Sequence, residues 1–120
     1  MYKLMIVDDS NIIRNRIQRA YDSGKFTLVA TATSGVAALE KFSIHRPDVI
    51  TMDLTMPQMD GLECIEKIIA QDPEVRILVV SALSDKATGI EALSLGASGF
   101  LCKPFSEEEL VDALEELMQD

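Results

Sequence analysis

The sequence contains no tryptophan, one histidine and two cysteines. Cys64 and Cys102 lie far apart, with no CxxC spacing and no histidine beside them, so neither a metal site nor a disulfide is indicated. Both are expected to be small core residues. The one histidine, His45, falls at a predicted helix end in SIHRPD, where a solvated or capping role is expected.

Long hydrophobic runs are also missing. No apolar run approaches the roughly 18 residues that span a bilayer, and the apolar run in MYKLMIVDDS is too short for a signal peptide. No low-complexity linker, internal repeat or second-domain fragment is visible. With 120 residues, 48% of them hydrophobic, the chain can bury a genuine core. We therefore expect one soluble, cytoplasmic domain over residues 1–120, without membrane insertion.

Positive charge is scarce as well. The chain has 11 basic and 20 acidic residues, a formal net charge of −9, and no Lys/Arg cluster. Direct nucleic-acid binding is disfavoured, because phosphate neutralisation needs a basic face. Most of the acidity fits an ordinary solvated surface, as in SEEELVDALEEL at 106–117, where the glutamates lie opposite an apolar stripe or in the first turn. The adjacent carboxylates of Asp8 and Asp9 do not fit that account.

Short apolar runs alternate along the chain with amphipathic helical patterns. The strand-like runs cover 3–7, 27–31, 48–52, 76–80 and 98–102, and five helices are expected between and after them. Ser106 and Glu109 form a capping box that opens the last helix. Apolar, β-branched strands separated by helices predict an α/β fold with a parallel sheet that is covered on both faces.

Polar side chains stand where these strands end. The first run ends in Asp8 and Asp9, the third in Asp53, the fourth in Ser81 and the fifth in Lys103. Each alone would be interpreted as a turn, cap or solvated residue. In a parallel sheet, however, all these ends lie at one edge, where open α/β sheets bind their ligands. Their coincidence at that edge predicts a functional site.

Three carboxylates cannot share a small site as bare anions. Like charges about 4 Å apart repel by roughly 4 kcal/mol at an effective dielectric constant of about 20, so a proton or a cation has to bind. Oxygen ligands at an open edge suit a hard divalent ion, and Mg²⁺ with some of its waters is expected. The cation, Lys103 and a hydroxyl can receive phosphoryl oxygens, and a carboxylate beside them can act as nucleophile.

Four motifs carry a resemblance to a known family: VDDS at 7–10, TMDLTMPQMDGLE at 51–63, VVSA at 79–82 and CKPF at 102–105. In this order, over essentially the whole chain, they resemble the receiver domains of two-component response regulators of the chemotaxis type (CheY-like). The resemblance implies a flavodoxin-like, doubly wound sheet of five parallel strands in the order 2-1-3-4-5, with five helices. It also implies a monomeric signalling phosphoacceptor, not an enzyme. A histidine kinase would be its phosphodonor and a downstream protein, such as a flagellar switch component, its output partner.

The resemblance also implies a role for each acidic residue. Asp53 would accept the phosphoryl group. Asp9, Asp53 and the backbone carbonyl of Thr55 would ligate Mg²⁺, and Asp8 would help through a water molecule.

The remaining matches concern phosphoryl binding and the switch. Ser81 and Lys103 would bind the phosphoryl oxygens. Phe100 matches an aromatic position that changes rotamer on activation and that is often tyrosine in the family. Two features shape the neighbouring loops: Pro57 and Gly61 predict a turn after Asp53, and in the family the proline at Pro104 follows a cis peptide bond.

Rival functions come from other classes. An aspartate-nucleophile phosphohydrolase would also use aspartate, Mg²⁺ and lysine, but such enzymes resemble a DxD pattern and usually carry a cap domain. A flavin-binding redox module would need a phosphate-binding loop where this chain has two anions. A receiver from a phosphorelay, or one separated from a DNA-binding output domain, is the serious alternative. Turnover of a small phosphomonoester would favour the hydrolase, whereas phosphorylation followed by slow loss would favour the receiver.

The first prediction concerns the lifetime of the phosphorylated protein. In the family, the residues two after the acceptor and two after the hydroxyl influence the attack of water on the phosphoryl group, and here these are Thr55 and Leu83. Leu83 offers no hydrogen bond to orient that water. We expect slower self-dephosphorylation than in a Leu83→Glu variant, measured as loss of the phosphorylated species over time. Equal rates in the two proteins would remove Leu83 from the mechanism.

Overall fold

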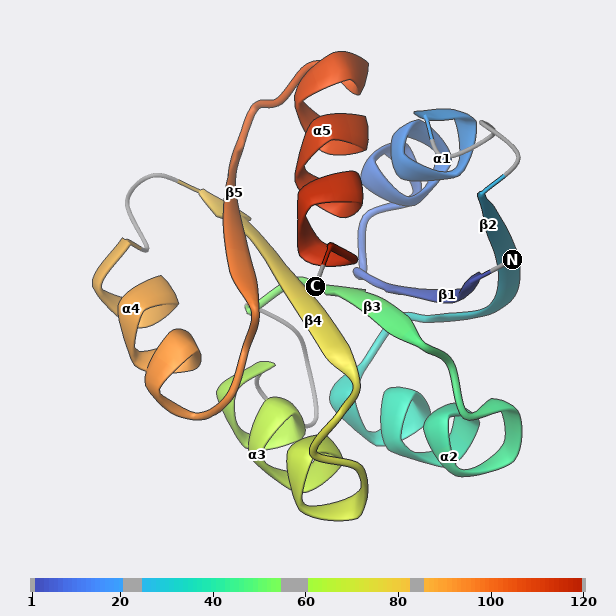
Figure 1. The fold of residues 1–120 in the computed structure, drawn as a ribbon, viewed down its shortest axis with the longest axis vertical. Coiled ribbons are helices and arrows are strands. Elements are labelled where there is room, and N and C mark those ends of the chain that lie inside the picture. Colours follow the sequence, from blue (N-terminus) through green and yellow to red (C-terminus); the bar gives the residue numbers. More distant parts are fainter. Residues whose placement is uncertain (1, 21–24, 55–60, 83–85, 120) are drawn as a thin grey trace.

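A parallel sheet of five strands forms the centre of the molecule, in the order β2-β1-β3-β4-β5 (Figure 1). The computed structural model describes residues 2–20, 25–54, 61–82 and 86–119. The strands are β1 (Tyr2–Val7), β2 (Phe26–Ala32), β3 (Val49–Met52), β4 (Arg76–Ala82) and β5 (Gly99–Lys103). The helices are α1 (Asn11–Ala20), α2 (Gly35–His45), α3 (Gly61–Gln71), α4 (Lys86–Ser94) and α5 (Glu107–Leu117). The predicted fold class and strand order are confirmed.

The strand boundaries differ slightly from those predicted. Ser81 lies inside β4 rather than after it, and Lys103 is the last residue of β5. Strands β4 and β5 extend beyond the ends of their predicted runs because hydrogen bonding to a neighbouring strand continues past the last apolar residue. Ser81 pairs with Cys102 across these two strands.

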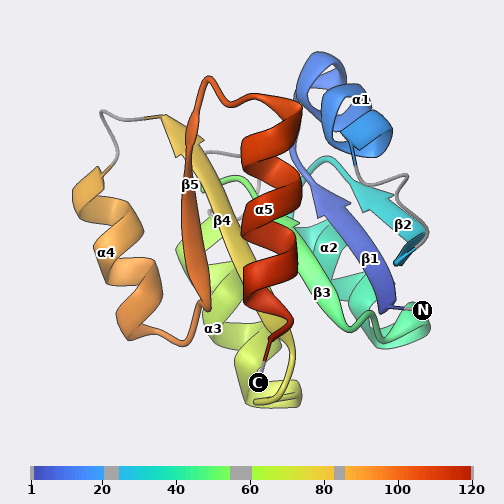
Figure 2. The same cartoon turned by 45° about the horizontal axis from the view of Figure 1, so that its top comes forward.

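Two hydrophobic cores lie on opposite faces of the sheet. Figure 2 shows α1 and α5 on one face and α2, α3 and α4 on the other. Strand side chains alternate between the faces, so each strand supplies both cores. In β1, for example, Leu4 and Ile6 join the core under α1 and α5, whereas Met5 and Val7 join the other. The buried parts of the strands are therefore largely apolar, as the sequence predicted, with Thr51 and Ser81 as buried polar residues.

Local sequence signals set several helix ends. The Ser106 hydroxyl accepts a hydrogen bond from Glu109 N at 3.0 Å, and Ser106 N donates to Glu109 Oε1 at 3.0 Å, which confirms the capping box. Ser34 caps α2 through Ala37 N at 3.2 Å. After α4, Gly96 has a φ of 118°, a conformation that other residues rarely adopt.

Some expectations are settled by the structure and some lie outside its described residues. Cys64 is fully buried, as expected, but Cys102 is only partly buried. His45 ends α2 with its side chain exposed, and its carbonyl accepts a hydrogen bond from Lys3 Nζ at 3.2 Å. Thr55, Pro57 and Leu83 lie outside the described residues. None of the described helices has both the length and the apolar character needed to cross a bilayer.

A buried hydroxyl in β3 generates the second prediction. Thr51 is 1% exposed between Ile6 and Leu78, and its Oγ1 has no hydrogen-bond partner among the described residues. Thr51→Val replaces this hydroxyl with a methyl group and removes the desolvation penalty. We expect the free energy of unfolding to rise by about 1 kcal/mol in urea denaturation. Thr33→Val, at an exposed position, is the control and should change little. A destabilised Thr51→Val protein would show that the hydroxyl has a stabilising partner.

Candidate metal centre

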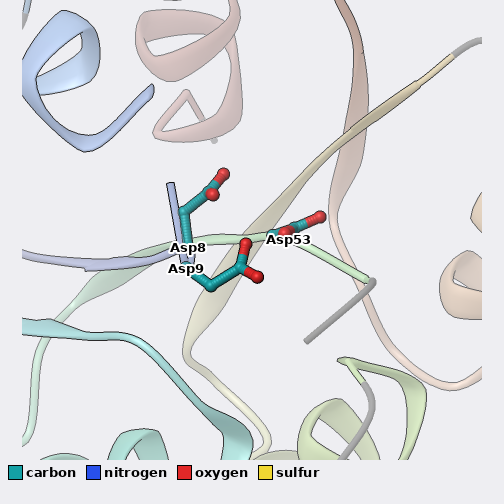
Figure 3. Close-up of side chains that lie close together, drawn as sticks. All are labelled: Asp8, Asp9 and Asp53. Atoms are coloured by element: carbon teal, nitrogen blue, oxygen red, sulfur yellow. The ribbon is translucent and has the colours of Figure 1, made fainter. Parts of the chain in front are cut away.

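Three carboxylates meet at the carboxyl edge of the sheet. Figure 3 shows Asp8 and Asp9 at the end of β1 and Asp53 at the end of the adjacent β3. One carboxylate oxygen from each residue lies within 4.8 Å of the others. Asp8 and Asp53 are only 1% and 5% exposed, whereas Asp9 is exposed. The sheet holds them together because β1 and β3 are neighbours, with Asp53 N donating to Val7 O at 2.9 Å.

Lys103 brings one positive charge to this cluster from β5. Its Nζ lies 3.1 Å from Asp8 Oδ2 and 3.8 Å from Asp53 Oδ1. The alternation of side chains along the strands explains why Lys103 contacts Asp8. Asp8 and Lys103 fall on the strand positions that face α1 and α5, whereas Asp9 falls on the positions that face the other side of the sheet. Three carboxylates and one ammonium, when all are ionised, leave a net charge of −2. This donor set fits a hard divalent cation, which prefers carboxylate oxygens.

Asp8 is held more tightly than its neighbour. Its Oδ1 accepts a hydrogen bond from Ser10 N at 2.9 Å, and its Oδ2 is paired with Lys103. Its backbone carbonyl accepts a hydrogen bond from Arg14 Nη1 at 2.6 Å. A buried carboxylate requires such partners, since an uncompensated charge in the interior is strongly destabilising. Asp9, beside it, keeps an exposed carboxylate that a ligand can reach.

Ser81 and Phe100 occupy neighbouring strands beside the cluster. Ser81 is buried in β4 and pairs with Cys102, the residue before Lys103. Phe100 is partly buried two residues earlier in β5, opposite Val79. Parallel partners project to the same face, and so do residues two apart in a strand. The hydroxyl and the ring therefore share the face that α3 and α4 cover.

The loops around the cluster also require particular backbones. Gly61 N donates to Leu54 O at 3.0 Å, and a Cβ at Gly61 would lie 2.5 Å from Leu54 Cα and 2.7 Å from Asp53 O. Any larger residue would have to displace the backbone beside Asp53. On the other side of the site the Lys103–Pro104 peptide bond is cis, as expected.

Sequence reasoning missed two contributors to the site. Ser10 and Arg14 contact Asp8 through a backbone N–H and a guanidinium, respectively. Ser10 stands in the VDDS motif, so its position was visible but its backbone contact was not. Arg14 gives no signal, because an arginine in the first turns of a helix is most simply interpreted as exposed. The structure brings together Asp8, Asp9, Asp53 and Lys103, and it places Ser81 on the adjacent strand.

The fold and the site together define a class: a doubly wound α/β domain with a cluster of carboxylates that suits a cation at the carboxyl ends of its strands. Strand order reverses between β1 and β3, which is where such sheets bind ligands. Residues 4–115 match the family model of the response regulator receiver domain. The chain belongs to this family, and it is a CheY-like receiver domain of a two-component response regulator.

Individual relatives cover nearly the whole chain. It is 38% identical over 115 residues to the chemotaxis protein CheY of Listeria monocytogenes, covering 96% of this chain and 97% of that protein. It is 35% identical over 117 residues to CheY of Bacillus subtilis, covering 98% of each. Among solved structures it resembles the complex of CheX and CheY with BeF3 and magnesium from Borrelia burgdorferi, with a TM-score of 0.93, 29% identity, and coverage of 99% and 90%.

The third prediction concerns repulsion within the acidic cluster. Asp9 adds an exposed negative charge close to Asp8 and Asp53, and Lys103 contacts only the latter two among the described ion pairs. We expect Asp9→Asn to raise the free energy of unfolding of the metal-free protein by up to about 1 kcal/mol. The same change should weaken Mg²⁺ binding by about tenfold or more.

Stability and affinity are measured on one preparation, by urea denaturation in EDTA and by isothermal titration with MgCl₂. The control is Glu66→Gln, which removes one negative charge from the exposed side of α3 and should leave Mg²⁺ affinity unchanged. An Asp9→Asn protein that is less stable without metal and binds Mg²⁺ normally would contradict the interpretation of the cluster.

Proposed function

We propose that residues 1–120 act as one cytoplasmic phosphoacceptor unit that receives a phosphoryl group on Asp53 from a histidine kinase, with Mg²⁺. Phosphorylation would then change a protein-binding face, in chemotaxis signalling. The observation that carries the proposal is the meeting of Asp8, Asp9 and Asp53 with Lys103 at one edge of the sheet. The similarity to chemotaxis proteins over almost the full chain supports the pathway.

Asp53 is the nucleophile in this proposal. One of its carboxylate oxygens attacks the phosphorus of a phosphohistidine, so that an O–P bond forms as the P–N bond breaks. The imidazole leaves with the electron pair of that bond. Lys103 lies 3.8 Å from Asp53 Oδ1, close enough for its ammonium to contact the oxygens of an attached phosphoryl group after a small movement. The Ser81 hydroxyl would donate a hydrogen bond to another of those oxygens.

The cation would be held mainly by Asp9 and Asp53, with the backbone carbonyl of Thr55. Asp9 is exposed and can offer its carboxylate directly. Both oxygens of Asp8 already accept hydrogen bonds, from Ser10 N and Lys103, which supports an indirect role through water. When bound, Mg²⁺ offsets the negative charge of the acceptor and of the incoming phosphoryl group.

Output would begin at Ser81. A phosphorylated Asp53 gains roughly −1.5 to −2 charge and three acceptor oxygens, which would draw the Ser81 hydroxyl toward them. Phe100 would then turn on the same face of the sheet, and the surface formed by α4, β5 and α5 would change. Moving an equilibrium from 1:99 to 99:1 takes about 5.5 kcal/mol, so the downstream partner would complete a shift that phosphorylation begins.

The fourth prediction tests the acceptor. Incubated with Mg²⁺ and acetyl phosphate, the protein should gain one phosphoryl group, and Asp53→Asn should lose essentially all of it because the variant lacks the proposed nucleophile. Intact-mass and peptide mass spectrometry give the extent and the position. Glu66→Gln should be phosphorylated as wild type, and EDTA should block the reaction in both. A phosphoryl group mapped to another residue would overturn the assignment, and rapid turnover of phosphomonoesters would favour the hydrolase.

The fifth prediction tests the switch. We expect Ser81→Ala and Lys103→Arg to bind beryllofluoride at Asp53 but to show smaller activated-state changes, since each alters one contact to the phosphoryl oxygens. Amide NMR shifts of Phe100 and of α5 are compared with and without beryllofluoride in wild type and in both variants. Shifts as large as those of wild type in both variants would show that neither side chain couples Asp53 to this face.

A further inference from the structure

Helix α4 presents an unusual face to the sheet. Gly89 and Ala92 are buried against the protein, whereas the larger Ile90 and Leu93 are 60% and 42% exposed. An amphipathic helix normally buries its large apolar residues. Here the inner face of α4 consists of residues with little or no side chain, so something else must fill the space beneath it.

The ring of Phe100 fills that space. A Cβ at Gly89 would lie 2.1 Å from Phe100 Cε2, 2.4 Å from Cδ2 and 3.1 Å from Cζ, and these ring atoms are its three nearest neighbours. The ring therefore occupies the volume that any side chain at position 89 would need. Figures 1 and 2 both show α4 beside β5, the strand that carries Phe100.

The ring lies on the same face of the sheet as the proposed switch hydroxyl. Phe100 pairs with Val79, and Ser81 pairs with Cys102 two residues further along the two strands. Ser81 is therefore a diagonal neighbour of Phe100, and the ring is interposed between this part of the sheet and the backbone of α4. A glycine inside a helix makes the helix less stable than an alanine would. Packing of the Phe100 ring against Gly89 offsets this loss of helix stability.

We propose that the ring of Phe100 packs into the space left by the missing side chain of Gly89, a contact that we call the seat. Through this seat, the position of α4 depends on the position of the ring. A ring that turns toward or away from Ser81 changes what supports α4, and the exposed Ile90 and Leu93 move with the helix. The seat itself rests on the contact geometry, whereas its use in signalling rests on the proposed function.

A double-mutant cycle tests the seat without any phosphoryl group. In a Phe100→Ala background, Gly89→Ala should raise the midpoint of urea denaturation, because alanine favours the helix and no ring opposes its methyl group. In the wild-type background the same change should lower the midpoint or leave it unchanged, because the methyl group expels the ring. Phe100→Leu provides a second background should Phe100→Ala fold poorly.

Ser94→Ala is the matched control for helix propensity. It lies at an exposed position of α4 and should shift the midpoint equally in both backgrounds. An equal rise for Gly89→Ala with and without Phe100 would overturn the seat and the proposal with it.

Beryllofluoride and Mg²⁺ test the use of the seat. Wild type and Gly89→Ala should show equal amide NMR shifts at Asp53 and Leu54, which report binding. The shifts at Ile90 and Leu93 should fall below half of their wild-type size in Gly89→Ala, because the helix no longer contacts the ring. Wild-type shifts in α4 of that variant would overturn the proposal. Absence of any shift at Asp53 in wild type would instead contradict the proposed function, and the cycle would still decide on the seat.

Discussion

The ammonium of Lys103 and the carboxylates of Asp8 and Asp53 form the interaction on which the carboxyl edge of this protein depends. Asp8 and Asp53 are buried, so neither charge is screened effectively by water, and Lys103 Nζ stands 3.1 Å and 3.8 Å from them. Asp9 adds a further carboxylate that leaves the cluster negative. The cluster can form in the fold and remains negative, a combination that suits a divalent cation and that the proposed phosphoacceptor would need.

The fold produces this interaction from residues 95 positions apart. Parallel strands bring their carboxyl ends to one edge, and the reversal of strand order between β1 and β3 puts Asp8, Asp9 and Asp53 side by side. Lys103 reaches them from β5, two strands away from β3. The same strand carries Phe100, so one short segment connects the charge balance of the site to the packing of α4. In the proposed switch, a change at Asp53 would reach a surface that the carboxylates do not touch.

Much of the fold and of the site follows from the sequence. Strands buried on both faces form nearly continuous apolar runs, so runs such as that at 76–80 could be recognised, and the polar residues that end them identified the functional edge. The capping box at Ser106 and Glu109 depends only on local sequence and could be predicted in the same way. The expectation of a cation site formed by aspartates with a lysine nearby follows from these residues and from charge repulsion. The strand order came from the family resemblance.

Contacts that depend on the packing of particular side chains could not be predicted. Arg14 reaches the carbonyl of Asp8 only because α1 begins immediately after the turn, and residue spacing does not give that geometry. In α4, apolar periodicity would place Ile90 and Leu93 inside, yet both are exposed. The ring of Phe100 takes the space beneath this helix, and only the three-dimensional arrangement shows that Gly89 makes room for it.

In the proposed function, Asp53, the neighbouring carboxylates and Lys103 form one site for a divalent cation and a phosphoryl group. A crystal structure of the protein with Mg²⁺ and beryllofluoride tests it most directly. We expect beryllofluoride on an oxygen of Asp53, Mg²⁺ bound by Asp9 and Asp53, and the ammonium of Lys103 in contact with fluoride. Beryllofluoride bound elsewhere, or a cation that avoids Asp9 and Asp53, would contradict it.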